Sequence, residues 1–577
     1  MGVPSLFSWL LKKLNSKQFK QISVITAECP EKNIDTLYID ANCLFHPQCF
    51  KILHHYTQIN DVEKLENKMI KRITEYISYL ISFTNCKKVF IAVDGVCPLA
   101  KMNQQRMRRY KSVQDNEIIN GIKKTHGLNT ITIWSNTTIT PGTIFMEKLH
   151  KHLLDYCKNL TIPCIYSSYK SSGEGEHKIL KEIKQNPGMT DIIYGLDADL
   201  IFLSLASGNS NIYLLRECAE LNKKYVKPTD PMAIEEELNY VSIDNVKLCI
   251  NTIINTQIND MNKTTIGFVD ENGNIPEYSG DHVDDYIIFC YFLGNDFIPN
   301  VPSIDIKNGG MDLLIKIYAT TYLASNEQFY VNNRINERFL HSFIYGMAKY
   351  EKYYFETKYV QYKQRLENQN CTSENPYEID VWNFENVKNV DVPDPIKLGI
   401  GDHALWKTRY YETYYSSTYD TELLINNMCK NYIEGIFWVT KYYFESNATN
   451  NWQYNYFHCP FASDLANYLN KNKKLNIKFK PDIVINPLTQ LLSVISPSCK
   501  NLLPIPYQKL MESESEIAYM FPQHVHIDVL YKHVQHKCIP YVPNINIEKI
   551  ISATKNIKIN NVEQERNKLC GNFVYEK

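Results

Sequence analysis

The stretch DIIYGLDADLIFL, residues 191–203, combines the features that decide the fold. It is a near-continuous apolar run, typical of a parallel strand buried on both faces, and the acids Asp197 and Asp199 interrupt it. TLYID (Thr36–Asp40) and KKVFIAVDG (Lys87–Gly95) have the same character, and each carries an aspartate at or near its end. We therefore predict three buried parallel strands with acids near their carboxyl ends.

Segments with a helical pattern separate these runs, for example residues 62–83 and 143–157. Alternation of buried strands and helices predicts an α/β domain with a mixed, largely parallel central sheet flanked by helices. In open sheets of this kind, ligands bind at the edge formed by the carboxyl ends of the strands. The acids are therefore expected at the ligand-binding edge.

Length and net charge limit the number of domains and the kinds of binding surface that the protein can have. With 577 residues the chain is too long for one compact core, so two or more domains are expected. The net charge of -1 excludes a uniformly basic coat, so any site for a polyanion must be a local patch. The 16 cysteines form no CxxC pair and no cluster with histidine at zinc-finger spacing. We find no secretion signal at the N-terminus. Together these features predict reduced thiols in an intracellular, soluble protein.

The two halves of the chain differ in pattern. We predict that residues 1–325 form the α/β domain and that residues 326–577 form a second, mainly helical and irregular region packed against it. Residues 350–366 suggest a helix with a polar face, and residues 420–444 a further helix. Pro-punctuated pieces after residue 487 favour irregular structure.

Seven acids lie beside glycines, on short turns or at strand ends. They are Asp40, Asp94, Glu174, Glu176, Asp197, Asp199 and Asp296. Gathered at one sheet edge they would repel one another and have raised pKa values, unless divalent cations lay among them. Mg²⁺ suits such oxygen ligands, and two ions about 3.5–4 Å apart can promote phosphodiester hydrolysis. Taken singly, each acid is better explained as a turn-former, a helix cap or a partner of the helix dipole.

A basic helix is predicted directly after AVDG. Lys101, Gln105 and Arg108 have the spacing i, i+4, i+7 and share one helical face, with Arg109 at its edge. Arginine and lysine side chains there suit a terminal phosphate. The alternative is a solvated helix face, which the neighbouring Asp94 makes less attractive.

The chain resembles the XRN-type 5'-3' exoribonuclease family. The resemblance rests on MGVPSLFSWL, YIDANCLFH, AVDGVCPLAKMNQQRMRRY, ITPGTIFM, SGEGEHKIL, YGLDADLIFLSL and DDYIIFCYFLGNDFIPNVPSIDI, which follow in order over most of the first 320 residues. DPIKLGIGDHALWKTRYYE, YIEGIFWVTKYYFES and PLTQLLSVISPSCKNLLPIPYQKLM are similar to the family's second conserved region. Both regions are present, and we expect no long C-terminal extension.

The resemblance implies a PIN/FEN-like nuclease core that degrades single-stranded RNA with a 5'-monophosphate processively to mononucleotides. The seven acids match the family's metal-binding residues, for Mg²⁺ with Mn²⁺ as a substitute. The side chains Lys101, Gln105, Arg108 and Arg109 match its 5'-phosphate pocket. His46 matches a residue that stacks on the first base, and Trp452 its stacking partner. Cys43 stands where the family usually has glycine.

Two alternatives stay open at this point. A flap or structure-specific DNA nuclease would share the acid-rich α/β core, but it carries a Gly-rich helical hairpin where this chain has IPNVPSIDIKNGGMDLLI. A non-catalytic RNA-binding protein would not need the complete acid set. We expect no membrane association and favour the cytoplasm over the nucleus.

Overall fold

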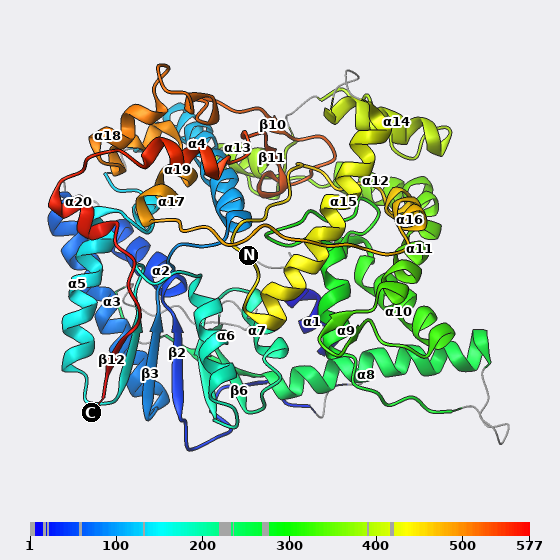
Figure 1. Cartoon of the computed structure of the whole chain (residues 1–577), viewed down its shortest axis with the longest axis horizontal. Coiled ribbons are helices and arrows are strands. Elements are labelled where there is room, and N and C mark those ends of the chain that lie inside the picture. The colour runs from blue at the N-terminus through cyan, green and yellow to red at the C-terminus, as the bar shows by residue number, and fades with distance from the viewer. Residues whose placement is uncertain are drawn as a thin grey trace.

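A sheet of eight strands organises the first part of the protein and lies at the lower left in Figure 1. The structure is a computed structural model that describes residues 6–14, 19, 22–56, 61–130, 133–218, 232–234, 236–267, 276–388, 392–415 and 420–576. In spatial order the strands are β1 (Ile25–Thr26), β7 (Leu238–Ser242), β6 (Ile212–Glu217), β5 (Asp191–Tyr194), β2 (Thr36–Asp40), β3 (Lys88–Ala92), β4 (Cys164–Ser167) and β12 (Phe573–Tyr575). Two small sheets pair β8 (Tyr330–Val331) with β9 (Arg334–Ile335), and β10 (Ile527–Asp528) with β11 (Ile539–Pro540).

The five inner strands, β6, β5, β2, β3 and β4, are all parallel. Antiparallel strands β7, β1 and β12 complete the two edges, so the predicted mixed, largely parallel sheet is confirmed. From β2 the chain builds outward through β3 and β4, and then returns to add β5 and β6 on the other side of β2. The strand order therefore reverses between β2 and β5, which is where open α/β sheets form their binding crevice.

Helices cover both faces of the sheet. Along β2, Leu37 and Ile39 belong to a core with α2, α3 and α5, whereas Tyr38 belongs to the core that contains α7, α8 and α9. This alternation follows from the two-residue period of a strand. The first helices are α1 (Leu6–Leu14), α2 (Ala41–His55), α3 (Val62–Thr84), α4 (Leu99–Thr125), α5 (Ile144–Asn159), α6 (Gly175–Gln185), α7 (Asp199–Ala206), α8 (Ile243–Met261) and α9 (Val283–Cys290). The helices expected over 62–83 and 143–157 are α3 and α5.

The rest of the described chain is mainly helical, as predicted. Its helices are α10 (Gly310–Ser325), α11 (Glu337–Tyr353), α12 (Val360–Glu367), α13 (Pro376–Glu385), α14 (His403–Tyr415), α15 (Thr421–Thr440), α16 (Ala462–Lys471), α17 (Pro487–Val494), α18 (Ile505–Gln508), α19 (Ile547–Thr554) and α20 (Asn561–Arg566). In Figure 1, α10, α11, α15 and α16 lie at the right, away from β12. One hydrophobic core includes both sheet residues and residues of α10, α11, α15 and α16. The division at residue 325 stays a prediction.

The stretch 191–203 is only partly a strand. β5 ends at Tyr194, a turn carries Asp197, and α7 begins at Asp199. All eight residues of α7 are buried, so the apolar run continues from the strand into the helix. A short apolar run cannot by itself distinguish a buried strand from a buried helix. Residues 350–366 also differ from one regular helix, because a π-helical segment, Tyr354–Tyr359, separates α11 from α12.

Among the described residues, no helix combines the length and the apolar character needed to cross a bilayer.

Candidate active site

Strand ends and helix starts bring the seven predicted acids to one edge of the sheet. The acid Asp40 ends β2, Asp94 follows β3, and Asp197 lies in the turn after β5. The side chains Glu174 and Glu176 flank the first residue of α6, Asp199 begins α7, and Asp296 follows a 3-10 turn, Tyr291–Leu293. Electrostatic coupling links them all: Asp40 with Asp94 and Asp197, Glu176 with Asp199 and Glu174, and Asp199 with Asp296.

Gly175 allows α6 to approach the strand ends. A Cβ atom on Gly175 would lie 2.9 Å from the Ala92 carbonyl oxygen and 3.0 Å from Asp40 Oδ1. Its backbone N–H donates to Asp94 Oδ1 at 2.7 Å. The glycine between Glu174 and Glu176 therefore lets two acids of a helix start lie against two acids of the strand ends.

Three of the carboxyl groups are held where ionisation is costly. Burial, and then Asp94, raise the pKa of Asp40 to about 7. Burial, and then Asp197, raise the pKa of Asp199 to about 7, and burial raises that of Glu176 well above its usual range. Because the folded protein has to tolerate this repulsion, a positive partner is expected among the acids.

Lys101 supplies one such positive charge. Its Nζ lies 2.5 Å from Glu174 Oε2, 2.9 Å from Asp296 Oδ2 and 3.9 Å from Glu176 Oε1. Burial opposes ionisation of Asp296, but Lys101, through its charge and its hydrogen bond, acts together with other positive charges such as Arg108, so the pKa of Asp296 lies below its ordinary value. The lysine predicted to bind phosphate therefore also balances the acids.

The other predicted phosphate ligands lie further along α4. Gln105 is buried, Arg109 is half-buried and Arg108 is exposed. The atoms Gln105 Oε1 and Arg109 Nη1 are buried without a hydrogen-bond partner. Burial, and then the neighbouring Arg108, lower the pKa of Arg109 to about 10. This end of the site therefore presents Arg109, whose guanidinium has an unsatisfied buried donor that an anion would satisfy. Arg106, on another face, instead donates to the carbonyls of Ser493 and Met520.

The two predicted stacking residues lie in different surroundings. Burial, and then Arg108 and Arg109, lower the pKa of His46 to about 4, which places its ring beside the arginines. Trp452 is 7% exposed and stacks on Trp438, with ring centroids 5.1 Å apart. Within the described part of the chain, no ring contact joins His46 to Trp452.

Cys43, the departure from the family pattern, touches an acid directly. Its Sγ–H donates to Asp40 Oδ2 at 2.8 Å. Burial, and then the charge of Asp40, raise the pKa of the thiol, so Cys43 is a neutral donor. The side chain at this position therefore helps to fix the orientation of Asp40.

Two tyrosines that the sequence did not single out complete the site. They lie on a π-helical turn, Lys441–Glu445, that continues α15. The hydroxyl of Tyr442 donates to Glu174, and that of Tyr443 donates to Asp199 Oδ1 at 3.1 Å. The only sequence signal was the pair of tyrosines inside IFWVTKYYFES, a segment noted for its resemblance and not for its chemistry.

The donor set suits a divalent cation of the Mg²⁺ type, because it consists of carboxylate oxygens whose mutual repulsion a cation would relieve. Among the described residues, no three His, Cys, Asp or Glu side chains are already arranged around a shared metal position. Lys101 lies among Glu174, Glu176 and Asp296, where it draws three carboxylates toward an ammonium group. The metal assignments of the seven acids stay predictions.

Seven acids at the carboxyl edge of a parallel sheet, with the buried and unsatisfied Arg109 Nη1 on the neighbouring helix, are typical of a hydrolase of the nuclease class. Comparison with known proteins agrees. The family model described as "XRN 5'-3' exonuclease N-terminus" matches residues 1–218, and the one described as "Xrn1 helical domain" matches residues 279–390 and 381–576. The chain therefore belongs to the XRN family of 5'-3' exoribonucleases.

Curated relatives match nearly the whole chain. The chain is similar to "5'-3' exoribonuclease 1" of Homo sapiens, with 27% identity over 98% of this chain and 35% of the human protein. It is also similar to "5'-3' exoribonuclease 2 homolog" of Drosophila melanogaster, with 26% identity over 100% of this chain and 73% of the relative. The "5'-3' exoribonuclease 2" of Saccharomyces cerevisiae shares 24% identity over 96% of this chain and 75% of the relative. The chain thus spans about a third of the human protein and about three quarters of the other two.

Proposed function

We propose that this chain degrades single-stranded RNA processively from a 5'-monophosphate end and releases mononucleotides. The observation that carries the proposal is the pairing of two neighbouring sites on and beside α4. Arg109 and Gln105 present buried polar atoms without partners, and Lys101, on the same helix, reaches the acids. A terminal phosphate and the first phosphodiester bond lie one nucleotide apart, and we assign the terminal phosphate to the basic site and the phosphodiester bond to the acids.

In this mechanism the basic end of the site holds the terminal phosphate. Arg108 and Arg109 donate to its oxygens through their guanidinium groups, and Gln105 adds a neutral donor. A 5'-hydroxyl end would leave these cations unpaired, whereas a cap or triphosphate would add bulk in a partly buried site. The preference for a monophosphate therefore follows from charge and size.

The acidic end positions the bond to be cleaved. The carboxylates of Asp40, Asp94, Glu174, Glu176, Asp197, Asp199 and Asp296 would hold a pair of Mg²⁺ ions. When bound, Mg²⁺ supplies activation of a water and stabilisation of the leaving oxygen. Tyr442 and Tyr443 hold the carboxylates of Glu174 and Asp199 in place, and Cys43 does so for Asp40.

Base stacking would be sequence-tolerant, as general degradation requires. His46 lies beside the arginines and is neutral near pH 7, because burial lowers its pKa. Its ring can therefore stack on the first base without adding charge. In this arrangement Trp438 occupies one face of the Trp452 ring, so a base could meet only its opposite face or its edge.

A single assay tests the proposal. End-labelled RNA with a 5'-phosphate, a 5'-hydroxyl or a cap is incubated with the purified protein, with and without Mg²⁺, beside a flapped DNA. We expect release of mononucleotides from 5'-phosphorylated RNA only when Mg²⁺ is present. Equal cleavage of the capped RNA, or preferential cleavage of the DNA flap, contradicts the proposal.

Arg108→Ala is expected to reduce the preference for 5'-phosphate over 5'-hydroxyl RNA about tenfold or more, because a charge-assisted bond to phosphate is lost. The measurement is the ratio of kcat/KM for the two RNAs. Lys124→Ala is the matched control, because it removes one positive charge from the exposed far end of the same helix. An unchanged ratio in the Arg108 variant places the phosphate pocket elsewhere.

Tyr443→Phe is expected to lower the rate of RNA hydrolysis about 10- to 100-fold, because residues that orient metal ligands have effects of this size. Tyr432→Phe is the control. It lies on α15 and donates to the Pro299 carbonyl at 3.1 Å, so its loss removes a buried hydroxyl bond that does not involve a carboxylate. We expect the control to keep its activity, and equal rates for both variants would show that Tyr443 has no role in orienting Asp199.

A further inference from the structure

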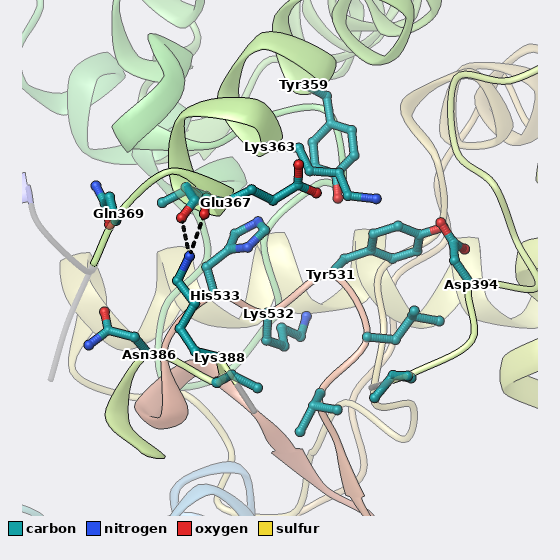
Figure 2. Close-up of a pocket in the computed structure, with 15 residues that line it drawn as sticks. Tyr359, Lys363, Glu367, Gln369, Asn386, Lys388, Asp394, Tyr531, Lys532 and His533 are labelled. Atoms are coloured by element: carbon teal, nitrogen blue, oxygen red, sulfur yellow. Dashed lines mark hydrogen bonds between the residues drawn. The ribbon is translucent and has the colours of Figure 1, made fainter. Parts of the chain in front are cut away.

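A cavity of about 320 Å³ lies outside the candidate active site (Figure 2). Its walls come from the π-helical segment Tyr354–Tyr359 and α12, from residues 386–388, 392 and 394, and from the loop 529–533 that follows β10. The predicted catalytic and phosphate-binding residues are not among its lining residues. Its volume is at the lower end of the range for small-molecule sites, which suits a ligand of one nucleotide unit.

Three lysines line the cavity, and they differ in the hydrogen bonds that their ammonium groups make. Lys388 donates to the carbonyl oxygens of Leu366 at 2.6 Å and Glu367 at 3.0 Å, at the end of α12 (Figure 2). Lys363 is exposed at the rim. The side chain of Lys532 makes no hydrogen bond and no ion pair with any described residue, and burial lowers its pKa. Lys532 is therefore a partly buried amine that forms no ion pair with a described residue, and the carboxylate of Asp528 is its strongest favourable electrostatic neighbour.

The acids of the cavity do not supply that partner. The carboxylate of Asp394 accepts from the backbone N–H of Ile396 at 3.1 Å, from that of Lys397 at 2.8 Å and from the hydroxyl of Tyr531. It is therefore already engaged on its own wall. Glu367 is exposed. An anion entering the cavity would meet Lys532 without having to displace an existing ion pair.

Two further polar atoms in the walls have no hydrogen-bond partner. They are the hydroxyl oxygen of Tyr359 and Nε2 of His533, both buried. Burial raises the pKa of Tyr359, so its hydroxyl keeps its proton, and burial lowers the pKa of His533 to about 4, so its ring is neutral near pH 7. Unsatisfied buried groups are costly, and a polar ligand would relieve that cost.

Aromatic and aliphatic side chains form the remaining surface. The rings of Tyr359 and Tyr531 meet edge to face, with centroids 5.9 Å apart and an interplanar angle of 74°. Val392 and Leu530 lie beside them. Such a wall favours a flat, partly apolar group.

We propose that this cavity binds a nucleoside monophosphate unit, with its phosphate at Lys532 and Lys363 and its base against Tyr359 and Tyr531. The unit could come from a free nucleotide or from a nucleotide within an RNA strand. Binding here does not depend on the catalytic proposal.

The position of the cavity connects it to the helix that carries the phosphate pocket. The segment that continues from loop 529–533 is joined to α4, because Gln535 Nε2 donates to Asp115 Oδ1 at 2.8 Å. In the segment just before that loop, the Val525 carbonyl accepts from Gln114 Nε2 at 3.1 Å. Arg108 and Asp115 are about 10 Å apart along the helix axis, at 1.5 Å rise per residue. Nucleotide bound in the cavity would therefore contact a segment packed against the same helix.

The test is a calorimetric titration of the full chain with adenosine 5'-monophosphate in metal-free buffer. We expect two sites. Lys532→Gln should weaken one of them at least tenfold, and Arg108→Ala should weaken the other. Arg365→Gln, which removes an exposed charge from α12 outside the cavity, should change neither. If Lys532→Gln binds the nucleotide at both sites as tightly as the wild type, the cavity proposal is overturned. If Arg108→Ala leaves both sites unchanged, the phosphate pocket of the proposed function is wrong, and the cavity proposal is unaffected.

A second variant guards against misfolding of the first. Val392→Trp starts from an exposed side chain and fills the cavity without emptying a core position. It should abolish the Lys532-dependent site, and unaltered binding in this variant contradicts the proposal.

Adenosine and inorganic phosphate should each bind this site at least tenfold more weakly than the nucleotide, and equal binding by phosphate alone would exclude a nucleotide site. A 5'-hydroxyl RNA oligonucleotide that displaces the nucleotide identifies RNA as the source, and failure to displace it identifies the free nucleotide.

Discussion

Asp199→Asn is expected to lower the rate of RNA hydrolysis at least about 10³-fold while leaving the fold intact. Metal-assisted stabilisation of the reacting phosphate is worth several kcal/mol, and each 1.36 kcal/mol corresponds to a factor of ten in rate. The asparagine has the same shape and can still accept the hydrogen bond from Tyr443. The measurement is single-turnover cleavage of 5'-phosphorylated RNA at saturating Mg²⁺.

The same substitution should stabilise the protein when divalent cations are absent. The folded-state pKa of Asp199 is raised to about 7 from an ordinary value of 3.8, so the folded state binds the proton more tightly than the unfolded state. Stability therefore falls as the pH rises from about 4 to about 7, and the asparagine variant escapes its share of that loss. Thermal unfolding in chelator across this pH range measures the effect.

Asp191→Asn is a matched control for both measurements. Asp191 begins β5, the strand that leads to the turn with Asp197, and burial, followed by Asp35, raises its pKa to about 7. Its replacement should give a similar gain in stability at neutral pH with no loss of activity. If Asp199→Asn retains the wild-type rate, or if Asp191→Asn loses activity to the same degree, the assignment of Asp199 to the reaction is wrong.

Lys101→Met is expected to lower the free energy of unfolding in metal-free buffer by about 3–5 kcal/mol, the usual result of removing one partner from a buried ion pair. Glu174 and Asp296 would lose the ammonium group that lies 2.5 Å and 2.9 Å from their oxygens. If these carboxylates bind divalent cations, Mg²⁺ or Mn²⁺ should restore much of the stability, because a bound ion stabilises the folded state by mass action. Denaturant unfolding with and without Mg²⁺ is the measurement.

Lys170→Met is the control for this prediction. Lys170 is also buried, and it lies 3.1 Å from Glu147 and 3.3 Å from Glu565, away from the seven acids. Its loss should also lower stability, but divalent cations should not restore it. Equal responses of the two variants to Mg²⁺ would contradict a metal site at Glu174 and Asp296.

The sequence predicted the parts of the fold and site that depend on local pattern. The strands at 36–40 and 88–92 were recognisable from their nearly continuous apolar sequences. The structure explains these sequences, because every residue from Leu37 to Asp40 and from Val89 to Ala92 is buried. Once the strands were placed, the acids at their ends followed from the geometry of a parallel sheet. The helix that carries Lys101 and Arg108 was visible from spacing alone.

Contacts between distant segments could not be predicted in this way. Tyr442 and Tyr443 reach Glu174 and Asp199 from a different helix, and no local periodicity signals such a contact. The placement of Lys101 among the acids depends on the packing of three separate elements. The strand at 573–575 has three residues, which is too short to show the alternation of a strand.

That last strand has a consequence for biosynthesis. β12 pairs antiparallel with β4, and nearby Cys570 donates its backbone N–H to the Lys170 carbonyl. Since a ribosome makes β12 long after β4, the outer edge of β4 stays open until β12 has been made, and open edges invite pairing with other chains. Completion of the central sheet therefore has to wait until residues 573–575 have been synthesised, so this sheet cannot close while only the segments that carry the acids have emerged.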